Sequence, residues 1–147
     1  MINMATITTA LQDQIQNHAS VDFLHVPVER SEYVNVDPNR TPWCGVYKGK
    51  VTFTPRSLGR HAKSFSAQIK LRIVVQAVDF LSAANCEDNL EDYIDKVMNA
   101  VWSDPTIDGN VDMVQDFEIE YQYQETNRES TFFQMAIITL TAEVATG

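Results

Sequence analysis

Residues 65–78 read FSAQIKLRIVVQAV, and this stretch decides the fold. Apolar and polar side chains alternate along it, which is the period-two pattern of a strand with one buried and one exposed face. Around Val74 and Val75 both faces become apolar, so we expect that end to be covered on both sides. The alternation predicts a strand over residues 64–76. The apolar set is Phe65, Ala67, Ile69, Leu71, Ile73 and Val75, and the polar set is Ser66, Gln68, Lys70 and Arg72.

An amphipathic helix is predicted after this strand, over residues 85–102. Its apolar residues recur at helical spacing, so one stripe faces a core. Asn85 is the expected N-cap, and the Asp104-Pro105 pair ends the helix. A shorter amphipathic helix is expected over residues 6–18. The stripe of the longer helix is Leu90, Ile94, Val97, Met98 and Val101, and that of the shorter one is Ile7, Leu11 and Ile15.

Further strands are expected on both sides of these elements. Residues 43–47 and 50–54 have the composition of two short strands, with Gly49 in a turn between them. Residues 111–124 alternate, and a last strand over residues 131–144 is apolar on both faces in its first half. That half is covered either by a helix of the same chain or by a neighbouring molecule.

The order of these elements predicts an α+β fold. We expect a largely antiparallel or mixed sheet with two helices packed on one face. A chain of 147 residues, of which 44% are hydrophobic, has the size and composition of one globular domain over residues 1–147. The same composition excludes a disordered or collagen-like protein.

Charge is distributed unevenly along the chain, whose formal net charge is −9. Residues 30–72 hold nine basic and two acidic residues, whereas residues 73–147 hold two basic and 15 acidic ones. Such asymmetry indicates either opposite patches that meet between identical subunits or strands that neutralise each other within one sheet. For the second case we predict that Glu118 and Glu120 face Lys70 and Arg72 across adjacent antiparallel strands.

Recognised catalytic and metal-binding motifs are missing from the sequence. It contains no GxxxxGK[ST], GxGxxG, HExxH, GxSxG or CxxC pattern. Cys44 and Cys86 are too few for a disulfide framework or a zinc site, and we interpret them as reduced thiols. Cys44 and His61 are types that form a nucleophile–base pair, but nothing in the sequence places them together. We expect no enzymatic activity, no metal and no cofactor.

The first residues and the apolar segments predict a protein outside membranes. Residues 1–5 lack a secretory signal, and no window is long and apolar enough to span a bilayer. The acidic balance disfavours binding of nucleic acid over the whole surface, because phosphate contacts need clustered cations.

Residues 55–63, PRSLGRHAK, form a basic loop that we expect to contact a partner. Loops of this composition often carry contacts on a rigid scaffold, and the arginine fork bonds carboxylates at two points. The alternatives are a solvated hairpin tip and a cradle for an anion. The candidate contact residues are Arg56, Arg60, His61 and Lys63.

The order of elements over residues 6–144 resembles the tail terminator (tail completion) proteins of long-tailed bacteriophages. The short N-terminal helix and four further segments carry the resemblance: PWCGVYKGKVTFTPRSLGR at 42–60, the alternating strand at 65–78, EDNLEDYIDKVMNAVWSDPTIDGNV at 87–111, and DFEIEYQYQETNRESTFFQMAIITLTAEV at 116–144. The resemblance implies a ring of six copies that caps the tail tube, stops its polymerisation and provides the surface to which the head joins. DNA passes through its lumen.

The resemblance also implies partners and a location. The partners are identical copies, the tail tube protein and a head–tail connector protein. The ring lies at the head-proximal end of the virion tail after assembly in the host cytoplasm. A runner-up interpretation is another ring component, namely a connector or tube subunit, and a further alternative is a small anion-binding module.

Acidic side chains are expected to line the lumen of such a ring. Like charge keeps the passing DNA from binding, because no counterions are released from its phosphates. The lumen candidates are Asp92, Asp95, Asp104, Asp108 and Asp112.

Overall fold

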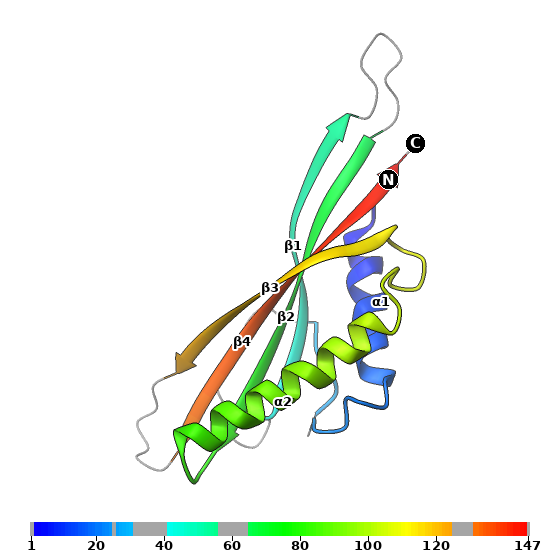
Figure 1. The fold of residues 1–147 in the computed structure, drawn as a ribbon. Coiled ribbons are helices and arrows are strands. Elements are labelled where there is room, and N and C mark those ends of the chain that lie inside the picture. The colour runs from blue at the N-terminus through cyan, green and yellow to red at the C-terminus, as the bar shows by residue number, and fades with distance from the viewer. Residues whose placement is uncertain (1, 25, 31–40, 56–64, 125–130, 147) are drawn as a thin grey trace.

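The computed structural model describes residues 2–24, 26–30, 41–55, 65–124 and 131–146. They form a sheet with two helices (Figure 1): α1 (Met4–Asn17), β1 (Trp43–Pro55), β2 (Phe65–Asp79), α2 (Ala83–Trp102), β3 (Met113–Gln124) and β4 (Phe132–Thr146). The strand order is β1-β2-β4-β3, and every neighbouring pair is antiparallel. The predicted α+β fold is therefore confirmed.

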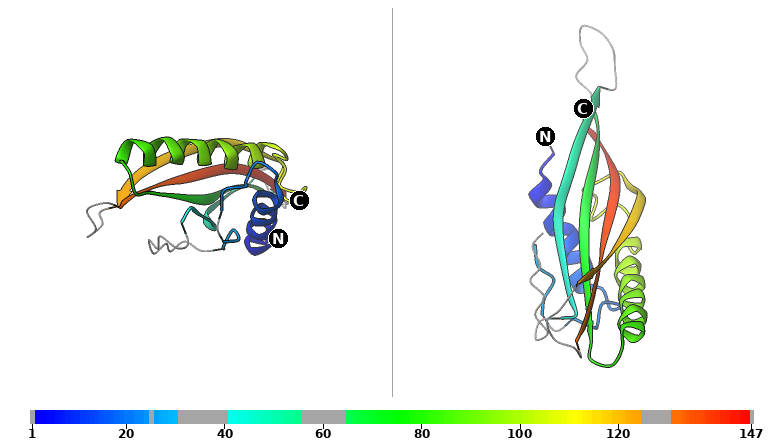
Figure 2. Two further views of the ribbon diagram at one scale, coloured as in Figure 1. Left: turned by 90° about the horizontal axis from the view of Figure 1, so that it is seen from below. Right: turned by 90° about the vertical axis from the view of Figure 1, so that its left-hand side faces the viewer.

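One hydrophobic core lies between the sheet and both helices, which cover the same face. The predicted apolar side chains of β2, from Ala67 to Val75, are fully buried there. Val46 of β1 and Ile138 of β4 lie in register on either side of Ile73. Figure 2 shows how strongly this sheet twists beneath the helices. The helices contribute the predicted stripes to the core: Ile7, Leu11, Ile15, Leu90, Ile94, Val97, Met98 and Val101.

The other face of the sheet is polar in the middle and apolar toward one end. Val74 is 2% exposed on this face and Val75 is fully buried on the helix side, so the prediction of cover on both sides is confirmed. Trp43 and Phe133 are buried on the same outer face, whereas Ile137 is only half-buried. The first half of β4 is thus covered by the helices on one side and partly open on the other.

The predicted turn at Gly49 is wrong, because β1 is one continuous strand with a bulge. Pairing with β2 shifts between Lys48 and Val51, so that Gly49 and Lys50 together lie opposite Lys70. A Cβ atom on Gly49 would lie 2.9 Å from the Lys70 carbonyl oxygen, closer than side chains approach backbone. A residue without a side chain therefore lets the two strands pair through the bulge.

Replacing Gly49 with alanine is expected to destabilise the protein by about 1–3 kcal/mol, the usual cost of forcing an extra carbon into a packed site. The obstructing atom belongs to the backbone, so it moves only if the strand pairing is disturbed. Urea unfolding measures the loss. The exposed Thr52→Ala on the same strand is the matched control, and equal stabilities of the two variants would refute the steric explanation.

Helix α2 begins two residues earlier than predicted, and its N-cap is Ser82 rather than Asn85. The Ser82 hydroxyl accepts the Asn85 N–H at 3.0 Å. Asp79, at the end of β2, accepts the N–H groups of Ser82 and Leu81, each at 2.8 Å, and the Asn85 side-chain amide at 2.7 Å. These bonds, the one from Ser82 foremost, hold the pKa of the Asp79 carboxyl below its usual value.

Replacing Asp79 with asparagine is expected to cost stability at pH 7 and progressively less in acid. A carboxyl whose pKa is lowered by folding stabilises the native state above its unfolded pKa of about 3.9. That stabilisation is lost as the pH falls through the folded pKa. Urea unfolding between pH 7 and pH 3 tests the sign, with the exposed Asp88→Asn as control at pH 7. A gap between wild type and variant that widens in acid would contradict it.

Candidate interaction surfaces

Two edges of the sheet are left open by the described part of the chain. Strand β1 has a single parallel bridge, Glu29 to Gly45, near its beginning. At the other edge, the Val114 N–H donates to the Pro105 carbonyl at 2.8 Å near the beginning of β3. Beyond these points no further described strand pairs with the outer edge of β1 or of β3. Unpaired strand edges are templates for pairing with another chain.

The predicted contact of Glu118 and Glu120 with Lys70 and Arg72 is wrong, because their strands are not neighbours. Strand β4 lies between β2 and β3. In register, Arg72 is opposite Thr139, and Thr139 is opposite Glu118. Both sets of charge lie on the face away from the helices, yet a full strand separates them. Neutralisation by direct cross-strand pairs is therefore excluded for these residues.

Basic side chains collect on and beside the β1 edge. The bulge places Lys50 opposite Lys70, and Arg72 lies next along β2 on the same outer face. Lys48, whose strand partner is the buried Leu71, lies on the helix side of the edge. Lys48, Lys50 and Arg72 are exposed, and Lys70 is half-buried. We call these residues the basic edge: Lys48, Lys50, Lys70 and Arg72.

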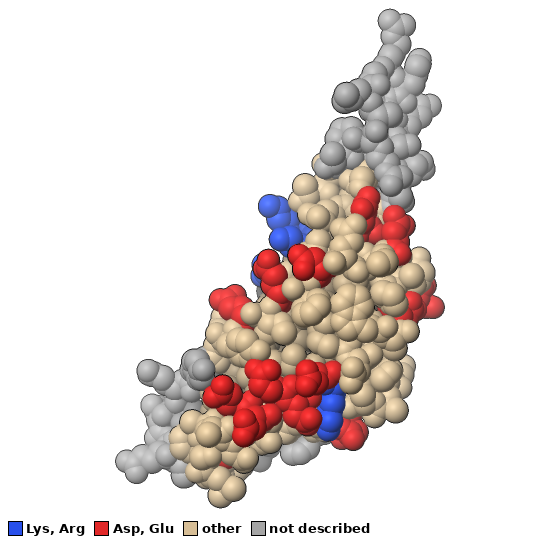
Figure 3. All heavy atoms as spheres, in the orientation of Figure 1, with Lys and Arg blue, Asp and Glu red and all other residues tan. Residues whose placement is uncertain are grey.

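Acidic side chains collect at the opposite side of the sheet, over α2 and along β3 (Figure 3). Glu91 and Asp95 are exposed on α2, and Glu118 and Glu120 are exposed on the outer face of β3. We call this set the acidic edge: Glu91, Asp95, Glu118 and Glu120. Of the lumen candidates, Asp95 thus belongs to the acidic edge.

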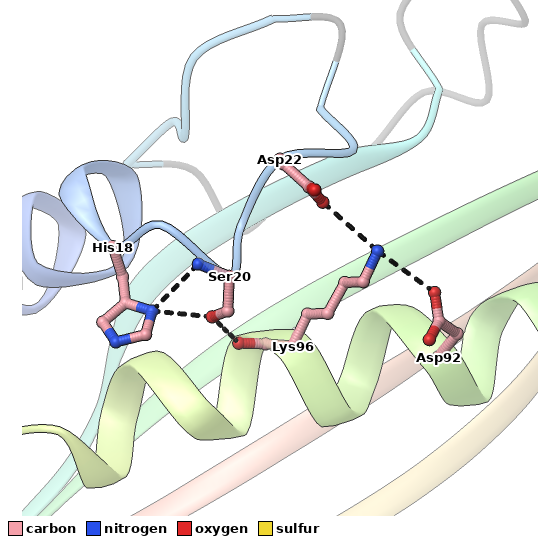
Figure 4. A network of polar contacts seen from close by, with 5 residues as sticks. All are labelled: His18, Ser20, Asp22, Asp92 and Lys96. Carbon is pink, nitrogen blue, oxygen red and sulfur yellow. Dashed lines mark hydrogen bonds and ion pairs between the residues drawn. The ribbon is translucent and has the colours of Figure 1, made fainter.

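Asp92, the other lumen candidate on α2, takes part in a polar contact with the segment after α1 (Figure 4). The Lys96 ammonium lies 3.3 Å from the Asp92 carboxylate and 3.2 Å from that of Asp22. Ser20 donates to the Lys96 carbonyl at 2.8 Å and contacts His18 Nδ1 at 2.7 Å. Exposed ion pairs contribute about 0–1 kcal/mol each, so this network orients the segment more than it stabilises the fold.

The remaining lumen candidates lie together in the turn between α2 and β3. Asp104 accepts the Thr106 hydroxyl at 2.6 Å, the Thr106 N–H at 3.0 Å and the Asp108 N–H at 2.9 Å. These bonds, that of the Thr106 hydroxyl foremost, lower the pKa of Asp104 and hold a turn in which Ile107 and Asp108 have positive φ angles of 49° and 55°. The Asp104 carboxylate therefore accepts hydrogen bonds within the turn. The side chains of Asp108 and Asp112 are exposed.

An aromatic surface lines the acidic edge, and the sequence pattern did not reveal it. Phe117 and Tyr121 lie on the helix side of β3 but remain 42% and 46% exposed. Trp102 of α2 meets Phe117 edge to face, with ring centroids 5.9 Å apart. A bond from the Tyr121 hydroxyl to Glu91 and partial burial raise the pKa of Tyr121 to about 12. Because β3 is an edge strand, α2 covers these two aromatic side chains only in part.

An open depression of about 500 Å³ lies between α1 and the turn that follows α2. Asp13 and Asp108 contribute carboxylates to its lining, and none of the described lining residues is a cation. This charge disfavours an anion at that position. The lining residues are Ala5, Thr6, Thr9, Ala10, Asp13, Asp108 and Asn110.

The basic loop with Arg56, Arg60, His61 and Lys63 lies outside the described residues. Its anchors are fixed, because β1 ends at Pro55 and β2 begins at Phe65, and these two residues pair. The loop therefore joins two adjacent antiparallel strands.

Both cysteines are unpaired, as the sequence predicted, and both are buried. Burial raises the pKa of Cys44 to about 12, and burial with the nearby Asp79 raises that of Cys86 to about 11. Thiols of this kind stay protonated at neutral pH and are poor nucleophiles. Among the described residues no group of His, Cys, Asp and Glu has the arrangement of a metal site. No described helix is long and apolar enough to cross a membrane.

No protein-family model matches this chain, and no curated protein matches it either.

Proposed function

We propose that this protein is a structural subunit of a phage tail, the tail terminator. Six copies form a closed ring that caps the tail tube, stops its polymerisation and provides the surface to which the head joins. The ring sits at the head-proximal end of the tail and contacts the tube protein and a head–tail connector protein.

A sheet with two edges of opposite charge, both left open by the described residues, is the observation that carries this proposal. A ring requires a heterologous interface, in which one patch meets a different patch on the next copy. The basic edge and the acidic edge are two such patches on opposite sides of the same sheet. The order of elements, with α2 followed by the β3–β4 hairpin, agrees with the resemblance to tail terminators.

Arrest of tube growth tests this function. The tube protein of the phage that encodes the chain is allowed to polymerise with and without the purified protein, and lengths are measured by electron microscopy. We expect shorter tubes with one added ring at one end. Incorporation along the whole tube would support a tube subunit instead. Stabilisation by phosphate in a thermal-shift assay, without any effect on tubes, would support the anion-binding module.

Reversing two charges in the basic loop tests its proposed contact with the tube or a neighbouring subunit. Arg56→Glu with Arg60→Glu is expected to leave the protein folded but to give tails of uncontrolled length or tails without heads. Arg56→Lys with Arg60→Lys is the matched control, because it keeps the charge and removes only the bidentate fork. Normal tail length and head joining in the Glu variant would reduce the loop to a solvated hairpin tip.

The lumen of the ring is proposed to be acidic. Asp108 is exposed and lies outside the acidic edge, so it remains the strongest of the candidates, since Asp92 is paired with Lys96 and Asp104 is bonded within its turn. A lumen lined mainly by Lys and Arg in a ring reconstruction would contradict this proposal.

A further inference from the structure

We propose that the acidic edge of one copy pairs with the basic edge of the next, so that β3 adds to β1 of the neighbour and the sheets of the ring become continuous. This inference deepens the proposed function and rests on it. The occupant of the β3 edge is therefore a second copy of this chain.

The topology permits such pairing with good strand geometry. Strands β1 and β3 are the two edges, and they run in opposite directions because the sheet is antiparallel throughout. A rotation about an axis roughly parallel to the strands therefore places β3 antiparallel to β1 of the next copy. Antiparallel strands of two molecules can pair directly, because no crossover connection is needed.

Charge matches on both faces of this junction. On the outer face, Glu118 and Glu120 would meet Lys50, with Lys70 and Arg72 one strand further away. On the helix side, Glu91 and Asp95 flank β3, and Lys48 lies at the edge of β1. Among the described residues no ion pair joins the acidic edge to the basic edge within one copy, and Glu91 keeps its bond to the Tyr121 hydroxyl.

Exposed aromatic residues lie on the matching side of both edges. Phe53, opposite the buried Ala67, is 56% exposed on the helix side of β1. Phe117 and Tyr121 are exposed on the helix side of β3. Cross-strand aromatic pairs contribute roughly 0.2–1 kcal/mol each. In the antiparallel pairing that sets Glu118 opposite Lys50, Phe117 lies diagonal to Phe53, so the junction that matches charge also covers these two aromatic side chains.

One local feature of β3 changes on pairing. The Phe117 N–H donates to the carboxylate of the preceding Asp116 at 2.8 Å. This bond satisfies an edge donor in the free protein, as side chains commonly do at strand edges. Pairing with a neighbouring strand replaces it with a backbone acceptor.

Chemical cross-linking between edges tests the inference. We would place one cysteine on β3 (Glu118→Cys), one on β1 (Lys50→Cys), and both in a double variant, and treat concentrated protein with a short bismaleimide. The native thiols are fully buried and stay silent. Each single variant alone is expected to remain monomeric on a denaturing gel. A mixture of the two single variants is expected to give cross-linked dimers. The double variant is expected to give a ladder of larger cross-linked species.

The outcomes separate this inference from the proposed function. Cross-linking within a single variant, or none in the mixture, would overturn the pairing of β3 with β1. Glu120→Cys combined with Lys50→Cys, both on the outer face, repeats the test for a register shifted by two residues. Electron microscopy of the same samples gives the copy number. A ring of six without the cross-links refutes the inference alone, whereas cross-linked open chains support the pairing and refute the closed terminator ring.

Discussion

Reversing the outer-face charge of β3 is expected to weaken self-association strongly, and a complementary variant is expected to restore it. In Glu118→Lys with Glu120→Lys, the acidic edge meets Lys50 of the next copy with like charge. Opposite cross-strand charges contribute roughly 0.2–1 kcal/mol per pair and like charges cost similar amounts, so two sign changes amount to about 0.8–4 kcal/mol, which weakens association about 4- to 700-fold.

A second variant, Lys50→Glu with Arg72→Glu, carries the reverse change on the basic edge. Alone it is expected to associate as poorly as the first variant. When the two variants are mixed and alternate around the ring, every junction again joins unlike charges. A ring of six closes in this way because it holds an even number of copies. Sedimentation velocity at low ionic strength measures all three samples. If the mixture fails to assemble although both variants are folded, unlike charges at the two edges do not hold neighbouring copies together.

Removing the side chain of Leu71 is expected to cause the largest loss of stability. Leu71 is fully buried in the middle of β2, opposite Lys48 on β1 and Leu140 on β4. Leu71→Ala removes packing and leaves a cavity that the surrounding strands cannot close, which costs about 2–5 kcal/mol in comparable sites.

Urea unfolding measures this loss as a lower midpoint with an unchanged slope. Gln68→Ala on the exposed face of the same strand is the matched control and is expected to stay within about 0.5 kcal/mol of wild type. Equal midpoints for the two variants would show that the helix-facing side of β2 is not the core.

Patterns of period 2 and 3.6 predicted the elements that bury apolar surface. The β2 alternation and the α2 stripe ending at Val101 are buried as expected, because burial itself imposes these periods. Helix starts were less accurate. The cap of α2 depends on the Asp79 carboxylate at the end of the preceding strand, and local propensity does not contain that contact.

The strand order was not predicted, and the error misplaced the charges. Alternation alone does not say which strand of the last hairpin lies beside β2. Two features of the sequence indicated that β4 is the central strand. The first is that Phe133 and Ile137 make its first half apolar on both faces, as a central strand requires. The second is that strand β3, with Glu118 and Glu120 on one face, has the charged character of an edge.

The candidate surfaces followed only in part from the sequence. The uneven charge along the chain indicated two patches, and the fold places them at opposite edges of one sheet. The sequence did not indicate the aromatic surface around Phe117, because residues that alternate on one face are normally covered. Its exposure depends on how far α2 reaches across the sheet, which is a property of the packed structure.

Counting the copies of this protein at the end of an imaged tail tests the central claim most directly. A cryo-electron microscopy reconstruction of the head-proximal end of the tail gives the copy number and the contact between neighbours. The account predicts one closed ring of six copies, one protein thick, in which β3 of each copy lies beside β1 of the next. A different copy number, or density for this protein along the whole tube, would contradict it.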